Sequence, residues 1–291
     1  MDRPWINHYD TGVPETINVP SVPVFQFLTD AAKAFSDKTA TQFYGKTTSY
    51  KALEEKVNKF ANALLKLNVK RGDRVAIMLP NIPQCVIAYY GVLKVGAIAV
   101  MTNPLYVERE LLVQLKDCGA ETIVTLDIFC HRIETVFEKT PLKHVILTSV
   151  GDALPFILSL FYPMKIRREG PSLKLPKRPY LHDMKLLMRA ESENVPQVIV
   201  SPSDLALLQY TGGTTGEPKG VMLTHQNLVA NTLQCRAWMP ELKKGEEVFL
   251  AVIPFFHVYG MSACMNLAIS LGARLVLLPR FATRDVLKTI Q

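Results

Sequence analysis

Cysteine is scarce in this chain and is not arranged in pairs. The 291 residues include 5 cysteines, and no two of them form a C-x-x-C pair. An odd number without such pairs argues against a disulfide framework and against a zinc site. We therefore expect a cytoplasmic protein whose cysteines pack as small core residues.

Long apolar runs are also missing. Residues 1–20 are polar and proline-rich and lack the hydrophobic region of a signal peptide. No uncharged apolar segment reaches the ~20 residues that a membrane-spanning helix needs. The longest candidate, Cys85–Met101, contains Gly91 and Lys94 and is expected to divide into a helix, a turn and a strand.

Neither sign of charge is in large excess over the whole chain. The formal net charge is +7, and no basic stripe is interleaved with aromatic residues, so we do not expect nucleic acid as a partner. A moderate positive charge fits anionic ligands or an anionic membrane surface. With 48% hydrophobic and 20% charged residues, the chain has enough apolar side chains to bury a large core.

Predicted helices and strands alternate along most of the chain. Hydrophobic periodicity predicts helices over 24–35, 50–67, 83–94, 108–117, 128–138, 227–238 and 261–271. Short β-branched or buried runs predict strands over 74–79, 97–101, 122–126, 144–149, 248–253 and 274–278. This alternation predicts the α/β class, with mostly parallel sheets covered by helices.

Residues 150–202 interrupt the alternation. Prolines 155, 163, 171, 176 and 179 lie there among basic residues, and we expect an irregular excursion from the sheet and not a second compact domain. The apolar run 154–164 is too short to span a bilayer, and prolines 155 and 163 are expected to limit any helix in it to about two turns. Residues 154–178 combine this run with Lys165, Arg167 and Arg168. They predict a peripheral contact with an anionic membrane, with a solvated loop as the alternative.

A glycine- and threonine-rich stretch, YTGGTTGEPKGV, covers residues 210–221. Glycines let the backbone approach a ligand closely, successive N–H groups form an anion-binding nest, and hydroxyls and a lysine bind phosphate oxygens. The spacing is not that of the common NTPase loop, and the apolar flanks place this loop between two strands. A surface turn is the alternative. The candidate phosphate-binding residues are Tyr210, Thr211, Gly212, Gly213, Thr214, Thr215, Gly216, Lys219 and Gly220.

Four segments, in order along the chain, resemble motifs of the acyl-adenylate-forming enzymes, a family that includes fatty acyl-CoA synthetases, coumarate-CoA ligases, luciferases and peptide-synthetase adenylation domains. They are Thr48–Leu53 (TSYKAL), Leu93–Tyr106 (LKVGAIAVMTNPLY), the glycine-rich loop and Pro254–Gly260 (PFFHVYG). The resemblance covers nearly the whole chain and points to the bacterial long-chain branch. It implies the fold of the large N-terminal domain of this family.

The resemblance also implies a chemistry. A carboxylate, here a medium- or long-chain fatty acid, would attack ATP to form acyl-AMP, and CoA would then displace AMP. The loop and Lys219 would bind the β- and γ-phosphates of ATP, and Thr211 would ligate Mg²⁺, although a neighbouring threonine would serve as well. His257 would lie beside the reacting carboxylate, where the alternative is a core histidine. His225 is expected to cap the helix that starts near Asn227.

An acyl pocket is implied near His257. The candidate wall residues are Phe255, Phe256, Val258, Tyr259 and Met261, and core packing is the alternative for each of them.

Motifs that this family carries further along have no counterpart in the sequence. The missing ones are the acidic residue that completes the magnesium site, the aspartate that holds the ribose, the hinge and the catalytic lysine. We therefore expect residues 1–291 to be a partial N-terminal AMP-binding domain, inactive on its own, of a longer fatty-acid–CoA ligase. An aryl-acid (coumarate-like) ligase and a non-catalytic nucleotide-binding module are the alternatives.

Overall fold

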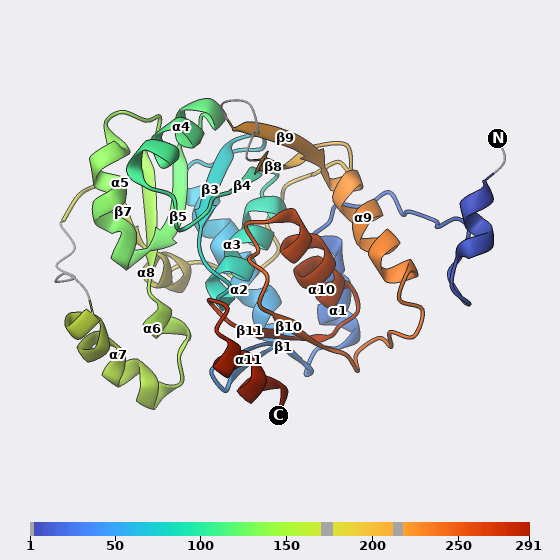
Figure 1. Cartoon of the computed structure of the whole chain (residues 1–291). Coiled ribbons are helices and arrows are strands. Elements are labelled where there is room, and N and C mark those ends of the chain that lie inside the picture. The colour runs from blue at the N-terminus through green and yellow to red at the C-terminus, as the bar shows by residue number, and fades with distance from the viewer. Residues whose placement is uncertain (1–2, 170–176, 212–217) are drawn as a thin grey trace.

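The computed structural model describes residues 3–169, 177–211 and 218–291 (Figure 1). Within these residues the strands form two sheets. The larger sheet has the order β7 (Leu181–Asp183), β6 (His144–Thr148), β5 (Thr122–Leu126), β3 (Arg74–Met78), β4 (Ile98–Met101), β8 (Leu205–Thr211) and β9 (Lys219–Thr224). Its neighbouring strands are parallel except for the antiparallel pair β8–β9. The predicted fold class is confirmed.

The smaller sheet has the order β10 (Val248–Ala251), β11 (Arg274–Leu277), β1 (Thr39–Phe43) and β2 (Lys46–Ser49). β10, β11 and β1 are parallel, and β1–β2 is an antiparallel hairpin. The sequence analysis missed this hairpin because its strands are short and rich in threonine and lysine. Its turn uses Tyr44 and Gly45 with positive φ, a conformation typical of tight hairpin turns.

Helices cover both faces of the larger sheet. Strand β3 shows why: Val75 and Ile77 join one buried cluster, whereas Ala76 and Met78 join another. The first cluster includes α2 (Tyr50–Lys66) and α3 (Pro83–Lys94), and the second includes α4 (Glu108–Cys118) and α5 (Cys130–Phe137). Successive side chains of a strand point to opposite faces, so a strand that is buried on both faces must be apolar throughout.

The remaining helices are shorter or more peripheral. They are η1 (Pro4–His8), α1 (Gln26–Ala34), η2 (Asp127–Phe129), α6 (Val150–Ala153), α7 (Phe156–Glu169), α8 (Met184–Arg189), α9 (His225–Ala237), the π-helical turn η3 (Gly260–Asn266), α10 (Leu267–Ser270) and α11 (Thr283–Ile290). The predicted helices match α1, α2, α3, α4, α5 and α9 to within a few residues. The helix predicted over 261–271 divides into η3 and α10.

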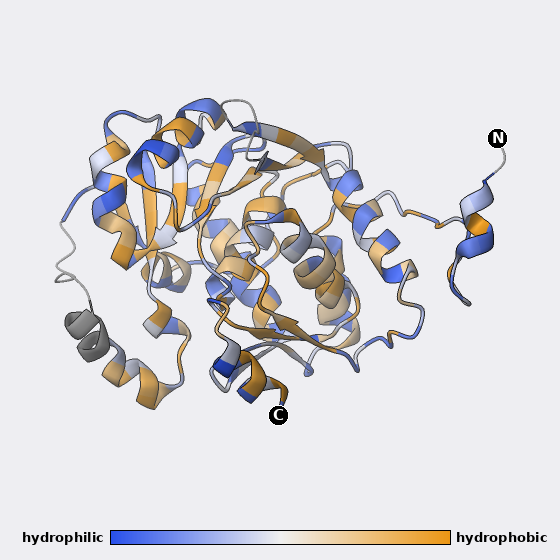
Figure 2. Cartoon of the chain, in the orientation of Figure 1, coloured by the Kyte–Doolittle hydropathy of each residue, from blue (hydrophilic) through white to orange (hydrophobic). Residues whose placement is uncertain are grey.

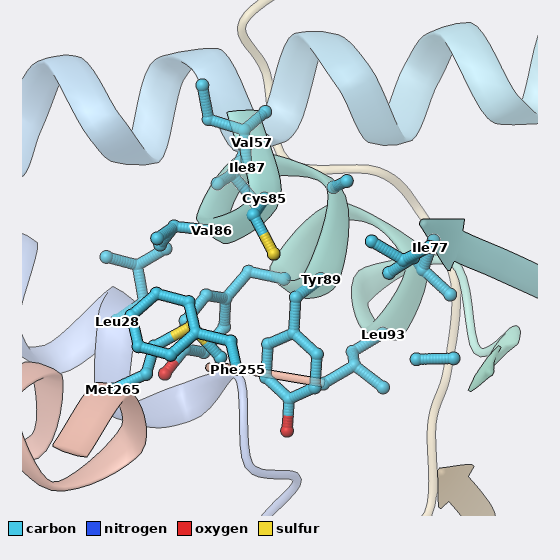
Figure 3. Packing of buried hydrophobic residues seen from close by; sticks show 14 of the residues in the cluster. Leu28, Val57, Ile77, Cys85, Val86, Ile87, Tyr89, Leu93, Phe255 and Met265 are labelled. Atoms are coloured by element: carbon cyan, nitrogen blue, oxygen red, sulfur yellow. The ribbon is translucent and has the colours of Figure 1, made fainter. Parts of the chain in front are cut away.

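Helix α3 lies in the centre of the molecule. Every residue of α3 after Pro83 is buried. Gly91 allows α2 to approach closely, since a Cβ at this position would lie 2.7 Å from Cδ1 of Phe60. Figure 3 shows Phe255 and Met265, from the chain following β10, among the α3 side chains of the same cluster. The core thus joins the two sheets through α3.

Residues 150–202 differ from the expectation in two ways. Strand β7 pairs with β6 and forms an edge of the larger sheet, so the segment does not leave the sheet altogether. Helix α7 runs from Phe156 to Glu169 and passes through Pro163, so it is longer than the two turns expected. A proline removes one backbone hydrogen bond from a helix but does not always end it, because neighbouring turns still hold the chain.

Candidate functional site

The glycine-rich loop connects two antiparallel strands, as the sequence analysis predicted. Thr211 at the end of β8 is the register partner of Lys219 at the start of β9, and Tyr210 is the partner of Gly220. Thr211 and Lys219 are both exposed. Gly212, Gly213, Thr214, Thr215 and Gly216 lie outside the described residues. The hairpin β8–β9 therefore brings the threonine and the lysine together at the base of the loop. We call this pair of strands the phosphate hairpin, after the ligand that the sequence analysis predicts for its loop.

Tyr210 anchors the phosphate hairpin to α4. Its hydroxyl donates a hydrogen bond to the carboxylate of Asp117 near the end of that helix. Burial and the hydrogen bond to Asp117 raise the pKa of Tyr210, so the phenol stays protonated. Its ring packs beneath Gly220, where a Cβ would lie 3.1 Å from the ring carbon Cζ. Tyr210 is therefore a structural support of the hairpin, and a side chain at position 220 would crowd it.

The segment that carries His257 follows β10. The backbone N–H of His257 donates to the carbonyl of Pro254 at 3.1 Å, and its carbonyl accepts from the N–H of Met261 at 3.0 Å. Its imidazole is exposed and lies 4.6 Å, between ring centroids, from Phe256. His257 is therefore not a buried core histidine, which was the alternative considered in the sequence analysis.

The five pocket candidates do not share one surface. Phe255 and Met261 are fully buried in the core, and Phe256 is partly buried. Val258 and Tyr259 are exposed, at 42% and 64% of their surface. Two surface cavities, of about 560 Å³ and 370 Å³, lie elsewhere and are lined by none of these side chains. In this conformation Phe255 and Met261 have the packing role that the sequence analysis kept as its alternative.

The structure brings the two predicted motifs into direct contact through a residue that the sequence analysis missed. Gln209, immediately before Tyr210, donates from Nε2 to the carbonyl of Phe256 at 2.8 Å. Asn81, which follows β3, bonds the same segment: it accepts from the N–H of Phe255 and donates to the carbonyls of Ala251 and Ile253. The sequence did contain an indication that Gln209 has a special role, because it is a lone amide side chain in the apolar run LALLQY.

His225 does not cap α9. The cap is Thr224, whose hydroxyl accepts from the N–H of Asn227 at 3.1 Å while Asn227 Oδ1 accepts from the N–H of Thr224 at 3.0 Å. His225 is fully buried, and its Nδ1 accepts from the N–H of Val24 at 3.3 Å. Burial lowers its pKa to about 4, which nearby Asp204 only partly opposes. The expected cap was one residue too late because Thr and His were adjacent candidates, and the smaller hydroxyl fits the cap geometry.

Magnesium binding by these residues alone has little support in the geometry. In the parts of the chain that the structure describes, no group of three or more His, Cys, Asp or Glu side chains could hold a metal ion. Thr211 offers one exposed hydroxyl. Mg²⁺ commonly binds one or two protein oxygens together with substrate phosphates and water, so the hydroxyl fits a site that a bound nucleotide would complete.

Comparison with known proteins gives consistent matches. Residues 28–291 match the model of the family described as AMP-binding enzyme. The long-chain-fatty-acid--CoA ligase of Bacillus subtilis (strain 168) is 42% identical over 290 residues, which cover 99% of this chain and 52% of that protein. The 4-coumarate--CoA ligase 1 of Petroselinum crispum is 30% identical over 249 residues, which cover 85% of this chain and 41% of that protein.

A solved structure shares the fold. The long-chain-fatty-acid-CoA ligase (FadD1) from Archaeoglobus fulgidus matches with a TM-score of 0.79 at 27% identity, over 97% of this chain and 52% of that one. The chain spans about half the length of the curated relatives it matches.

Proposed function

Because this chain belongs to the AMP-binding enzyme family, we propose that the protein activates a medium- or long-chain fatty acid with ATP and transfers the acyl group to CoA. The observation that carries this proposal is the contact between Gln209 and Phe256, which places the phosphate hairpin beside the segment with the exposed His257. The fatty-acid class is supported by the similarity of this chain to the long-chain-fatty-acid--CoA ligase of Bacillus subtilis.

The proposed reaction has two steps. A carboxylate oxygen attacks the α-phosphorus of ATP, the bond to the bridging oxygen breaks, and pyrophosphate leaves. The thiol sulfur of CoA then attacks the acyl carbon and loses its proton, and AMP leaves with the electron pair of the C–O bond. Phosphoryl chemistry of this kind depends mainly on positioning and on charge stabilisation.

The residues have separate roles in this proposal. Lys219 and the loop 210–220 bind the β- and γ-phosphates and stabilise the leaving pyrophosphate. Thr211 supplies an oxygen ligand to Mg²⁺, which when bound neutralises phosphate charge. The imidazole of His257 orients the substrate carboxylate and does not act as a base, since an ionised carboxylate needs no deprotonation. Phe256, Val258 and Tyr259 contact the acyl chain.

ATP–pyrophosphate exchange, measured on the protein at its natural full length, tests the proposal. Exchange should require an added fatty acid. Lys219→Ala should reduce it by roughly 10- to 150-fold, because losing a hydrogen bond to a charged group removes about 1.5–3 kcal/mol. Lys139→Ala, an exposed lysine distant in sequence from the hairpin, is the control and should not change the rate. Exchange that proceeds without a carboxylate contradicts the proposal, and a preference for coumarate over fatty acids favours the aryl-acid alternative.

We also propose that α7 rests on an anionic membrane surface, from which a fatty acid would be taken. Its first turns are apolar, as Figure 2 shows, and yet their side chains are strongly exposed. The exposed fractions are 83% for Phe156, 68% for Ile157, 64% for Leu160 and 57% for Phe161. Exposed Lys177 and Arg178 follow in the chain and would complement anionic headgroups. Across the described residues, the structure contains no helix of the length and apolarity required to cross a bilayer.

Co-sedimentation with vesicles tests this contact. Binding should increase with the fraction of anionic lipid and decrease with salt. Replacing Phe156 and Phe161 by serine, or Lys165, Arg167 and Arg168 by glutamate, should reduce binding. Equal sedimentation with neutral and anionic vesicles, unchanged in both variants, would leave α7 as a solvated segment only.

A further inference from the structure

Two buried side-chain amides hold the short segment that leads from β10 to His257. Asn81 is 2% exposed and makes three hydrogen bonds to it. Its Oδ1 accepts from the N–H of Phe255 at 2.9 Å, and its Nδ2 donates to the carbonyls of Ala251 at 3.1 Å and Ile253 at 2.9 Å. One side chain thus satisfies three backbone groups of an irregular segment that has few sheet bonds of its own.

Gln209 bonds the same segment at a second point, one residue before His257. It is 6% exposed, and its Nε2 donates to the carbonyl of Phe256, the residue directly before His257. Its Oε1 is buried and has no hydrogen-bond partner among the described residues. A buried polar atom without a partner costs free energy, so an apolar side chain would suit this strand better if stability were the only requirement.

The helix that follows leaves the segment little freedom. A Cβ at Gly260 would lie 2.4 Å from the carbonyl oxygen of Pro254 and 2.7 Å from that of Ile253. The start of η3 therefore packs directly on the backbone that Asn81 bonds. Residues 251–257 are therefore held by the hydrogen bonds of the two amides and by the close contact of Gly260.

The amides also connect the two sheets. Gln209 lies in β8 of the larger sheet, which carries the phosphate hairpin, and Asn81 lies in the connection that follows β3 of that sheet, whereas His257 follows β10 of the smaller sheet. In the residues that the structure describes, these two amides make direct hydrogen bonds between that part of the fold and the segment that carries His257. Misplacing a reacting group by about 1 Å is enough to cost about 100-fold in rate.

We propose that Asn81 and Gln209 are positioning residues that set the place of His257 relative to the phosphate hairpin, a role that rests on the proposed function. They act on the carboxylate through His257 and contact no reacting atom. Gln209 lies two residues before Thr211 in β8, so any shift of the hairpin is passed to Phe256 through a single side chain.

Gln209→Leu tests the role, with Gln84→Leu as a matched control. Gln84 is also buried, also donates from Nε2 to a backbone carbonyl at 2.8 Å (that of Ser149), and also has an unpartnered Oε1. Both variants should therefore lose similar stability. In fatty-acid-dependent ATP–pyrophosphate exchange, Gln209→Leu should lower kcat/KM by about 10- to 100-fold, whereas Gln84→Leu should stay within about threefold of the parent.

A double-mutant cycle separates positioning from general damage. In a His257→Ala background, Gln209→Leu should cause little further loss, because the residue that it positions is already gone. If the two losses multiply independently, or if Gln84→Leu slows exchange as much as Gln209→Leu, the positioning role is wrong.

Hydrogen exchange keeps the inference testable if the protein has no fatty-acid-dependent activity, a result that would refute the proposed function alone. The amides of Phe255 and His257 should then exchange faster in Gln209→Leu than in Gln84→Leu. Equal protection of these amides in the two variants overturns the inference whatever the activity.

Discussion

Helix α3 and the first turns of α7 are both apolar, but they lie in opposite environments. In α3 every residue after Pro83 is buried, between α2 and the larger sheet. In α7 the aromatic and aliphatic residues at the start of the helix are exposed, and the helix meets the rest of the fold mainly at α6. Figure 1 shows α3 enclosed by other elements and α7 at the periphery.

This difference shows that a hydrophobic sequence indicates that a segment is suited to burial. It does not indicate which other part of the protein, if any, buries that segment. Helix α3 follows β3 directly and must return beside it, so the crossover places it on the sheet. Helix α7 follows β6 near the edge of the sheet, where only β7 is added beyond it. A helix beyond the edge of a sheet has no sheet surface of its own to cover.

The largest effect is expected at the one charge that α3 buries. Lys94 donates to Glu54 at 2.5 Å and to Asn58 Oδ1 at 2.8 Å, and its side chain is 2% exposed. Lys94→Met should lower the free energy of unfolding by about 3–5 kcal/mol, because it leaves the carboxylate of Glu54 buried without a counter-charge. Urea denaturation measures the change. The double variant Lys94→Met/Glu54→Leu should recover most of the loss, and a small effect of the single variant would contradict our account of α3.

A smaller loss is expected for an apolar side chain of α3. Leu93 is fully buried in the main cluster. Leu93→Ala should cost about 2–5 kcal/mol in urea denaturation, because it removes buried apolar surface and leaves a cavity. A cost below about 1 kcal/mol would mean that the core around α3 collapses to fill the space.

The pH dependence of stability extends the comparison to a buried group that titrates. The pKa of His225 falls from 6.5 to about 4 in the folded protein because of burial. The unfolded chain therefore binds this proton first, so the free energy of unfolding should decrease as the pH falls from about 6.5 to about 4, by at most about 3 kcal/mol. Above pH 6.5 the group is neutral in both states and this dependence ends.

His225→Asn is the test of that dependence. Asparagine keeps an acceptor for the N–H of Val24 but does not titrate, so the variant should lose stability more gently than the parent over the same pH range. His144 and His182 also have pKa values lowered by burial, and they remain in both proteins. Parallel curves for parent and variant would show that His225 does not contribute.

The smallest effect is expected on α7. Leu160 is 64% exposed, so Leu160→Ala should change the free energy of unfolding by no more than about 0.5 kcal/mol. Leu160→Ala and Leu93→Ala delete the same side-chain atoms. The difference between their changes in the free energy of unfolding therefore measures the effect of burial. A loss on α7 as large as that on α3 would mean that another part of the protein covers α7 in solution.

Much of the fold could be predicted from periodicity. Helices α2, α3 and α4 and strands β3, β4 and β5 have strong local patterns, and their observed bounds lie within a residue or two of those predicted. Strands β1, β2 and β7 were missed because they are short, polar or next to prolines. Strands β1 and β7 pair with strands that are distant in the sequence, and β2 pairs with β1. Long-range pairing leaves no periodic signal in the strand itself.

The candidate site divides in the same way. The glycine-rich loop between two strands and the segment of His257 were visible as local strings of residues, because their chemistry requires particular side chains at close spacing. Gln209 and Asn81 were not recognised, since each is a single amide whose partners lie 47 and 174 positions away. A hydrogen bond between distant segments depends on how they are folded together, which no local pattern records.

The sequence by itself therefore determined the α/β class, the alternation of elements and the position of the glycine-rich loop between two strands, because periodic burial and glycine-dependent backbone geometry are local properties. Only the tertiary structure decided that α3 is enclosed while α7 is exposed, that Phe255 lies in the core while His257 lies at the surface, and that two amides join the sheets between them. These outcomes depend on which surfaces come into contact when the whole chain folds. A side chain is buried only when a second surface packs against it, so burial cannot be read from one segment alone.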